Sequence, residues 1–373
     1  MVEVVCCMEN DIALIVPDNF RAFGDKVDKH LQKLTGSNKS FVIRPNLVRF
    51  NNGEGKCIVN DPVRGKDVYI LSDVSNYSIT YDALGGIRHM SPDEHFQDIK
   101  RIINSLCGHA RKITVIMPYL YQSRQDKRTG KESLDLAMAE GELKHYGVSE
   151  VVTADAHNKS ACDNASPNMS INNFYCSDDM LLSLIKNERI NFNNTMVVAP
   201  DTGAFDRANF YASILGRVPV GVFYKQRDYD IVDGGLHPVT KHEFMHSGKV
   251  KGKDAIVVDD MIASGGSILD TAEKLKDKGI DRVFLLATFG LFTKGPTKFD
   301  KSYSEGKFNR VYATNLNYVP QNIINLEWFR QVDCSDKVAS IIYNLNNNKS
   351  IGELLNAKKN TIEKIKVLRK EYS

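Results

Sequence analysis

The chain has 373 residues, of which 42% are hydrophobic and 25% charged, and its formal net charge is +3 at pH 7. This length exceeds what one compact core usually holds, so we expect two packed domains. The small net charge argues against nucleic acid as a partner, and no run of about 20 apolar residues is present that could span a bilayer.

The N-terminal segment MVEVVCCMEND has no basic region ahead of an apolar stretch, so a secretory signal is not expected. The seven cysteines of the chain are scattered, and none forms a C-x-x-C pair. Reduced thiols in the cytoplasm are therefore predicted, rather than a disulfide framework or a zinc site.

Short apolar runs alternate with segments of helical period along most of the chain, which predicts an α/β fold with a mostly parallel sheet. The predicted strands are residues 12–16, 68–71, 113–117, 151–154, 196–199, 220–223, 255–258 and 283–287. The predicted helices are residues 92–107, 133–146, 177–187, 207–215 and 267–278.

This pattern occurs twice, and it predicts the domains 1–175 and 176–335 followed by a helical tail, 336–373. The polar segment 158–173 is expected to be a loop near the junction. In the tail, Ile362, Ile365 and Leu368 mark one face and lysines crowd the rest, which is typical of a solvated terminal helix.

The strongest local signal is the segment 255–267, AIVVDDMIASGGS. An apolar strand runs into two carboxylates and a small-residue loop, at the strand end where open α/β sheets bind ligands. The loop lets backbone N–H groups approach a phosphate, and the next helix adds its positive end. Asp259 and Asp260 can accept from sugar hydroxyls or hold a metal through water. The structural alternative is an acidic pair followed by a serine helix cap. No P-loop or dinucleotide fingerprint is present.

The segment resembles the phosphoribosyl-pyrophosphate binding loop of the phosphoribosyltransferase fold, and its flanks resemble the ribose-phosphate pyrophosphokinase family. The resemblance covers most of the chain. It implies two phosphoribosyltransferase-like α/β domains, each with a mostly parallel sheet flanked by helices. The residues that it implies for ribose-phosphate binding are Asp259, Asp260, Ala263, Ser264, Gly265, Gly266 and Ser267.

Two segments resemble the ATP-contacting segments of that family. In VRFNNGE (48–54), the resemblance implies that Phe50 packs on adenine and Glu54 accepts from its amino group, often across a subunit interface. Asn52 stands where the family usually has Asp, and its amide still offers an oxygen. Segment 117–128, MPYLYQSRQDKR, implies ATP contacts by Arg124, Gln125 and Asp126. Taken alone, these segments would be a turn with a core aromatic and a solvated basic loop.

Three further segments resemble the catalytic and metal-binding parts of the family. TADAH at 153–157 implies that His157 serves the Mg²⁺–ATP site as a catalytic residue and metal ligand. APDTGA at 199–204 implies that Asp201 binds Mg²⁺, which typically takes one or two carboxylates plus substrate phosphates. FYKQR at 223–227 resembles the base of a catalytic loop, and implies that Lys225 and Arg227 neutralise charge on the transferred group.

One motif matches a zinc-binding pattern by chance, and several positions differ from the residues usual in the family. HEFMH at 242–246 matches a zinc-protease pattern that requires a helix, but the segment is too short for a good helix, so a loop or strand is expected. Ala263 stands where the family loop usually has Asp, and Ala156 where it usually has Leu. Extra residues occur around 76–88, around 290–307 and at the C-terminus.

The resemblance therefore implies a cytoplasmic, Mg²⁺-dependent enzyme that transfers the β,γ-pyrophosphate of ATP to C1 of ribose 5-phosphate. It also implies a homo-oligomer, such as a hexamer, with no nucleic-acid or membrane partner. Two alternatives stay open. A phosphoribosyltransferase that consumes phosphoribosyl pyrophosphate would not need the ATP segments. A silent regulatory homologue is favoured by Ala263 and Asn52, but it would not need the retained cations, His157 and Asp201.

Overall fold

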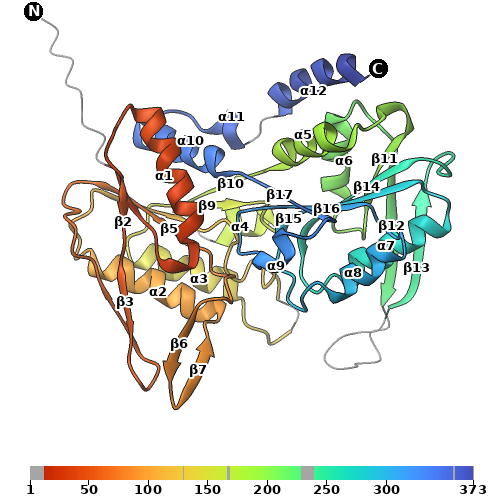
Figure 1. Cartoon of the computed structure of the whole chain (residues 1–373). Helices are drawn as coiled ribbons and strands as arrows, with labels where there is room; N and C mark the ends of the chain where they lie inside the picture. The colour runs from red at the N-terminus through yellow and green to blue at the C-terminus, as the bar shows by residue number, and fades with distance from the viewer. Residues whose placement is uncertain (1–11, 129, 166–168, 228–238, 356–357, 373) are drawn as a thin grey trace, which may run out of the picture. The chain divides into compact units, whose positions relative to one another are not determined.

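Two sheets of mostly parallel strands organise the chain (Figure 1). The computed structural model describes residues 12–372 apart from 129, 166–168, 228–238 and 356–357. The described residues divide into two units. Unit 1 contains the residues up to 175 together with 315–318 and 333–356, and unit 2 contains 176–314, 319–332 and the C-terminal residues from 357. No helix within the described residues has the length and apolar character needed to cross a bilayer.

The sheet of unit 1 has six strands in the order β10-β9-β8-β5-β1-β2, and all neighbouring pairs are parallel. Its strands are β1 (Ile12–Ile15), β2 (Val42–Ile43), β5 (Asp67–Leu71), β8 (Lys112–Ile116), β9 (Glu150–Ala154) and β10 (Ser170–Phe174). Four of them were predicted to within one residue at each end, because strands buried on both faces read as continuous apolar runs.

Helices cover both faces of this sheet (Figure 1). They are α1 (Arg21–Thr35), α2 (Pro92–Ser105), α3 (Asp135–His145), α4 (Lys159–Ala165), α10 (Ser335–Asn346) and α11 (Gly352–Leu355), with a short 3-10 helix η1 (Asp18–Phe20) before α1. α1 and α10 pack on each other. On the opposite face, Phe96 of α2 and Leu136 of α3 share a core with Ile15, Ile70 and Val115 of the strands.

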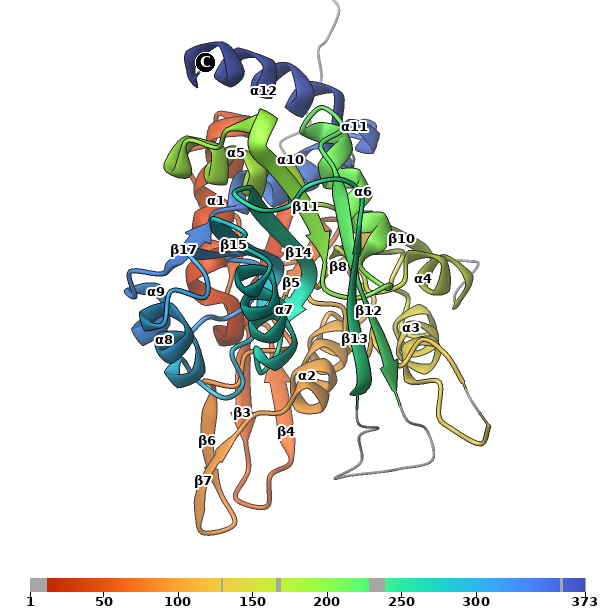
Figure 2. The ribbon, with the colours of Figure 1, turned by 90° about the vertical axis from the view of Figure 1, so that its right-hand side faces the viewer.

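Two antiparallel hairpins extend away from this sheet side by side (Figure 2). One is formed by β3 (Asn46–Arg49) and β4 (Gly55–Ile58), and the other by β6 (Thr80–Ala83) and β7 (Gly86–His89). Their tips are joined by a hydrogen bond of 2.8 Å from the Leu84 backbone N–H to the Asn51 carbonyl. The extra residues noted around 76–88 thus form the second hairpin.

The sheet of unit 2 has seven strands in the order β13-β12-β11-β14-β15-β16-β17, and only β13 is antiparallel to its neighbour. They are β11 (Thr195–Ala199), β12 (Val220–Arg227), β13 (Val239–His246), β14 (Asp254–Ile262), β15 (Arg282–Gly290), β16 (Arg310–Thr314) and β17 (Phe329–Val332). The four predicted strands, β11, β12, β14 and β15, are all present, although three of them continue past the apolar run at their carboxyl ends.

The helices of unit 2 also occupy both faces. They are α5 (Ser177–Glu188), α6 (Phe205–Ile214), α7 (Gly266–Asp277), α8 (Thr297–Ser304), α9 (Gln321–Ile324) and α12 (Lys358–Tyr372), with a 3-10 helix η2 (Phe192–Asn194). Leu269 of α7, Phe299 of α8 and Trp328 share a core with Val257 and Leu285 of the strands. α12 packs against α5 and α6.

The structure corrects the expected loop at 158–173, which contains helix α4 and strand β10. The polar side chains that suggested a loop bind neighbouring segments instead. Asn172 donates to Glu150 at 2.6 Å, and Asn173 Oδ1 accepts from the Ala156 N–H at 2.9 Å. A polar edge strand of this kind lacks the apolar signal on which the prediction depended.

The segment 242–246 lies in strand β13, which agrees with the expected loop or strand. A zinc site of the H-E-x-x-H type needs both histidines on one face of a helix, so this segment does not form one. The expected tail is helical, but its parts belong to different units: α10 and α11 lie in unit 1, and α12 lies in unit 2. α12 also has a buried face, because Thr361 and Ile365 are each 2% exposed.

Candidate functional site

In unit 2 the acidic pair and the small-residue loop lie at the carboxyl ends of β11 and β14. β14 pairs with β11 only as far as Val257, but it continues beside β15 to Ile262. The end of β14 therefore extends past β11, and it carries Asp259 and Asp260 into the region where the loop after β11 begins. The sequence prediction ended this strand too early, at Val258.

The two carboxylates of β14 are bound to the backbone that follows them. Asp259 Oδ1 accepts from the Asp260 N–H at 2.9 Å, and Asp260 Oδ1 accepts from the Met261 N–H at 2.7 Å. Burial raises the pKa of Asp259 well above its ordinary range, and the nearby charges of Asp260 and Asp201 act in the same direction, whereas Arg207 opposes them. Sugar hydroxyls or a cation at this position would stabilise the crowded carboxylates.

The loop between β14 and α7 is only three residues long, Ala263 to Gly265. The backbone N–H groups of 291–293 donate to the carbonyls of Ile262 and Ala263 and hold the loop against the segment after β15. No side chain caps the N-terminus of α7, which begins at Gly266. The first N–H groups of a helix are natural donors to a phosphate.

Gly265 is the position where this loop requires glycine. Its φ is +82°, and a Cβ at this position would lie 2.4 Å from the ring of Phe299 in α8. The ring thus supports the loop from behind and leaves no space for a side chain. Phe299 could not be identified from the sequence, because it lies in the extra segment after β15.

Asp201 follows β11 and shapes the start of α6. Its Oδ1 accepts from the N–H groups of Gly203 at 3.0 Å and Ala204 at 3.2 Å. The second carboxylate oxygen of Asp201 has no hydrogen bond among the described residues. Asp201 and Asp259 are near enough for their charges to interact, so unit 2 offers a group of carboxylate oxygens of the kind that Mg²⁺ prefers. Arg207 in α6 lies near enough for its positive charge to act on Asp259. The sequence did not indicate this residue.

Lys225 and Arg227 lie in β12, which pairs with the antiparallel edge strand β13. Their side chains, and residues 228–238 that follow, lie outside the part of the chain that the structure describes. The backbone register shifts between Gln226 and Arg227.

In unit 1 the structure brings two predicted ATP segments together. Asn158 Nδ2 donates to Asp126 Oδ2 at 2.6 Å, so the turn after β8 and the turn after β9 are joined. His157 precedes Asn158 and is exposed, as are Arg124 and Gln125 of the first turn. Carboxyl ends of neighbouring parallel strands form one edge of a sheet, which explains why segments distant in sequence meet here.

The third segment lies apart at the tip of the β3–β4 hairpin. The Phe50 ring is 48% exposed. The Asn52 amide binds the Glu54 carboxylate at 2.9 Å, and Asn52 Oδ1 accepts from the Glu54 N–H at 3.1 Å. A carboxylate at position 52 would repel Glu54, so the amide at this position holds the acidic side chain in place.

Comparisons with known proteins agree with the resemblance stated from the sequence. Residues 12–147 match the N-terminal domain of ribose phosphate pyrophosphokinase, and residues 177–306 match the phosphoribosyl transferase domain. The ribose-phosphate pyrophosphokinase of Pasteurella multocida is 28% identical over 82% of this chain and 89% of its own length. That of Vibrio cholerae is 27% identical over 83% and 90%.

A solved structure supports the same fold. The crystal structure of phosphoribosylpyrophosphate synthetase from Mycobacterium smegmatis covers 90% of this chain and 99% of its own, with a TM-score of 0.74 and 22% identity. The expected fold class, two phosphoribosyltransferase-like domains with mostly parallel sheets flanked by helices, is confirmed.

Proposed function

Because the chain belongs to the ribose-phosphate pyrophosphokinase family, we propose that it is an enzyme that transfers the β,γ-pyrophosphate of ATP to ribose 5-phosphate. The C1 hydroxyl oxygen of the sugar attacks the β-phosphorus and loses its proton. The bond from the β-phosphorus to the oxygen bridging it to the α-phosphorus breaks, and AMP leaves. The products are AMP and phosphoribosyl pyrophosphate.

The observation that carries this proposal is the arrangement of β14, its loop and α7. The backbone N–H groups from Ser264 to Ser267, at the uncapped start of α7, are proposed to bind the 5-phosphate. Asp259 and Asp260 are proposed to accept from the ribose hydroxyls. Hydroxyl donors favour the charged carboxylates and would counteract the effect of burial on Asp259.

Magnesium fits the oxygen donors of unit 2. Asp201 is the residue proposed to hold Mg²⁺, together with the phosphates of ATP, and His157 is proposed to contribute to Mg²⁺–ATP binding. The bound cation would neutralise charge on the phosphates. Phe50, Asn52 and Glu54 are proposed to contact adenine, and Arg124, Gln125 and Asp126 the rest of ATP. Lys225 and Arg227 are proposed to stabilise charge in the transition state.

Ala263 favours one second candidate, a catalytically silent regulatory homologue. The resemblance implies a carboxylate at this position, and the methyl group of Ala263 can neither accept a hydrogen bond nor hold a metal. The loop backbone and the neighbouring Asp259 and Asp260 are retained, however. We therefore favour the active enzyme, in which the carboxylate at position 263 is dispensable.

The test is the formation of AMP and phosphoribosyl pyrophosphate from ATP, Mg²⁺ and ribose 5-phosphate, followed by ³¹P NMR. Wild-type chain is compared with Ala263→Asp and with the double variant Lys225→Ala/Arg227→Ala. Activity in the wild type, with a loss of about a hundredfold or more in the double variant, is expected. Activity only in Ala263→Asp would identify the silent homologue instead, and equal turnover in the double variant would contradict the role of the two cations.

A further inference from the structure

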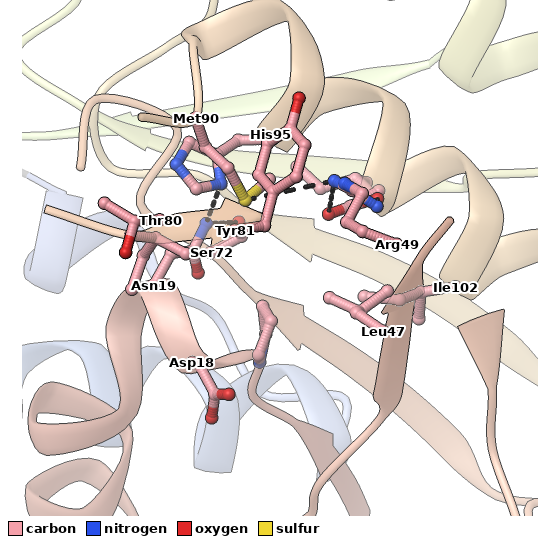
Figure 3. A pocket seen from close by; sticks show the side chains of 14 residues that line it. Asp18, Asn19, Leu47, Arg49, Ser72, Thr80, Tyr81, Met90, His95 and Ile102 are labelled. Carbon is pink, nitrogen blue, oxygen red and sulfur yellow. Dashed lines mark hydrogen bonds and ion pairs between the residues drawn. The ribbon is translucent and has the colours of Figure 1, made fainter. Parts of the chain in front are cut away.

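A cavity of about 140 Å³ lies in unit 1 and is lined by none of the residues assigned to the reaction. Its walls come from the turns after β1 and β5, from β3, from α2 and from the β6–β7 hairpin (Figure 3). Residues 79–81 and Met90, from the extra segment and its end, supply one wall, so this chain's own insertion helps to form the cavity.

The cavity occupies a position where open α/β sheets bind ligands. After β1 the chain crosses to β2 on one side of the sheet order, and after β5 it crosses to β8 on the other side. The carboxyl ends of β1 and β5 therefore flank the point where the strand order reverses. Crevices at such switch points are the usual binding sites of this architecture.

One end of the cavity is polar, and one acceptor there, the side-chain oxygen of Asn19, has no hydrogen-bond partner among the described residues. The His95 Nε2–H donates to the Asn76 carbonyl at 2.8 Å, so the neutral ring offers Nδ1 as an acceptor to the Asn19 amide at 3.1 Å. Ser72 Oγ and the Asp73 carbonyl also lie within hydrogen-bond distance of Asn19 Nδ2, each at 2.9 Å, so the two amide hydrogens are shared among three acceptors. Within the described chain, Asn19 Oδ1 is buried without a partner.

Ser72 supplies a complementary donor beside this acceptor. Its Oγ accepts from Asn19 and keeps its own hydrogen to donate. Asn19 is 6% exposed and Ser72 1% exposed, so both groups are shielded from solvent. An acceptor next to a donor matches a ligand edge that carries an N–H next to a carbonyl or ring nitrogen.

The other walls fit a neutral ring. Leu47 and Ile102 lie across the cavity from Asn19 (Figure 3). Arg49, the cation of the lining, gives both terminal nitrogens to Asp98 at 2.9 and 2.6 Å, so it is not left to bind a phosphate. A cavity of about 150 Å³ is known to hold one benzene ring, so the size here fits one six-membered ring.

From this combination we propose that the cavity is a binding site for a neutral six-membered nitrogen heterocycle of the pyrimidine-base type. The ring lies against Leu47 and Ile102, its N–H donates to Asn19 Oδ1, and its carbonyl or ring nitrogen accepts from the Ser72 hydroxyl. This site is separate from the proposed reaction and does not depend on it.

The first experiment titrates uracil and cytosine into the full chain labelled with ¹³C at the methionine methyl groups. Met90 lines the cavity, so its methyl signal, assigned with Met90→Leu, is expected to shift through the ring current while the other methionine signals stay unchanged. The compound 1,3-dimethyluracil has no N–H and is expected to bind at least about tenfold more weakly. Shifts at other methionines alone, or no binding of either base, would overturn the proposal.

The second experiment blocks the cavity from its exposed rim. Thr80→Trp places a large ring at the mouth, whereas Asp82→Trp makes the same change on the same strand at a residue outside the lining. Base binding is expected to be lost in the first variant and retained in the second. Ser72→Ala is expected to weaken binding about fivefold. Equal affinity of Thr80→Trp and the wild type would place the base elsewhere and contradict the assignment.

Discussion

Glu140 in α3 is a buried carboxyl group whose two oxygens have no hydrogen-bond partner among the described residues. Burial, with a smaller contribution from the charge of Asp163, raises its pKa to about 8. Its ordinary value of 4.5 applies in the unfolded chain. The folded state therefore holds a proton that the unfolded state loses between these values, so stability falls as the pH rises from about 4.5 to 8.

Glu140→Gln is expected to remove this dependence, because the amide carries no charge to bury. The variant should gain stability relative to the wild type as the pH rises from 5 to 8, by roughly 4 kcal/mol at most. Denaturant unfolding at several pH values measures the difference. Glu142→Gln on the same helix is the control: its side chain is 45% exposed and paired with Lys100 at 2.6 Å, so this variant should lose at most about 1 kcal/mol of stability. Parallel pH profiles for wild type and Glu140→Gln would show that this carboxyl is solvated.

Gly265 and Gly266 are adjacent glycines at which the same substitution, to alanine, is expected to have different effects. Gly265→Ala forces a Cβ against Phe299 at a positive φ, whereas a Cβ at Gly266 meets only Ser264 Oγ, at 3.9 Å. We expect Gly265→Ala to lose about 1–3 kcal/mol of stability and to weaken ribose 5-phosphate binding, and Gly266→Ala to retain its stability. Thermal unfolding and calorimetric titration measure the two effects. Equal stability of the variants would contradict the supporting role of Phe299.

At the scale of elements, a buried ion pair fastens the β3–β4 hairpin to α2. The side chains of Arg49 and Asp98 are 8% and 5% exposed, and two hydrogen bonds join them. Arg49→Met would leave Asp98 with Arg101 alone, at 2.8 Å. A loss of about 3 kcal/mol is expected, because the remaining carboxylate stays buried. Arg101→Met, at a side chain 25% exposed, should cost less, and denaturant unfolding of both variants decides whether it does.

The elements also show what the sequence could predict. Eight central parallel strands followed from apolar runs, since burial on both faces fixes their composition. The hairpins did not, because β7 is exposed along its length and carries no alternation. β10 was not predicted because its sequence, SINNF, has no apolar run: its asparagines are stabilised by hydrogen bonds to neighbouring segments instead. The start of α2 had an unused signal: Ser91 and Glu94 form a capping box before an apolar face.

The candidate site likewise contains parts that the sequence predicted and parts that it did not. The position of Asp259, Asp260 and the loop followed from residue order, because the carboxyl end of a parallel strand is a fixed place in the fold. Arg207 and Phe299 did not, since each reaches the site through tertiary packing that no local pattern records. The cavity beside Asn19 was also missed, because its walls come from five separate segments.

For the whole molecule, unit 1 is completed by residues distant in sequence. The Tyr318 N–H donates to Asp73 at 2.6 Å, and Lys337 Nζ donates to the Tyr175 carbonyl at 2.9 Å. In α10, Val338 and Ile341 are fully buried, and this helix packs on α1. The fold of unit 1 therefore requires a segment that the chain adds only after most of unit 2.

A chain that ends at Val332 is expected to lose the folded state of unit 1, because it exposes the apolar face of α1 that α10 covers. A chain that ends at Leu355 lacks only α12, which packs in unit 2, and should keep unit 1. Limited proteolysis with mass spectrometry locates the cleavage sites. The only tryptophan, Trp328, is buried in unit 2 and reports that unit by fluorescence. Resistance of residues 12–175 in the shorter chain would show that unit 1 folds without α10, so that the packing of α10 on α1 adds little to its stability.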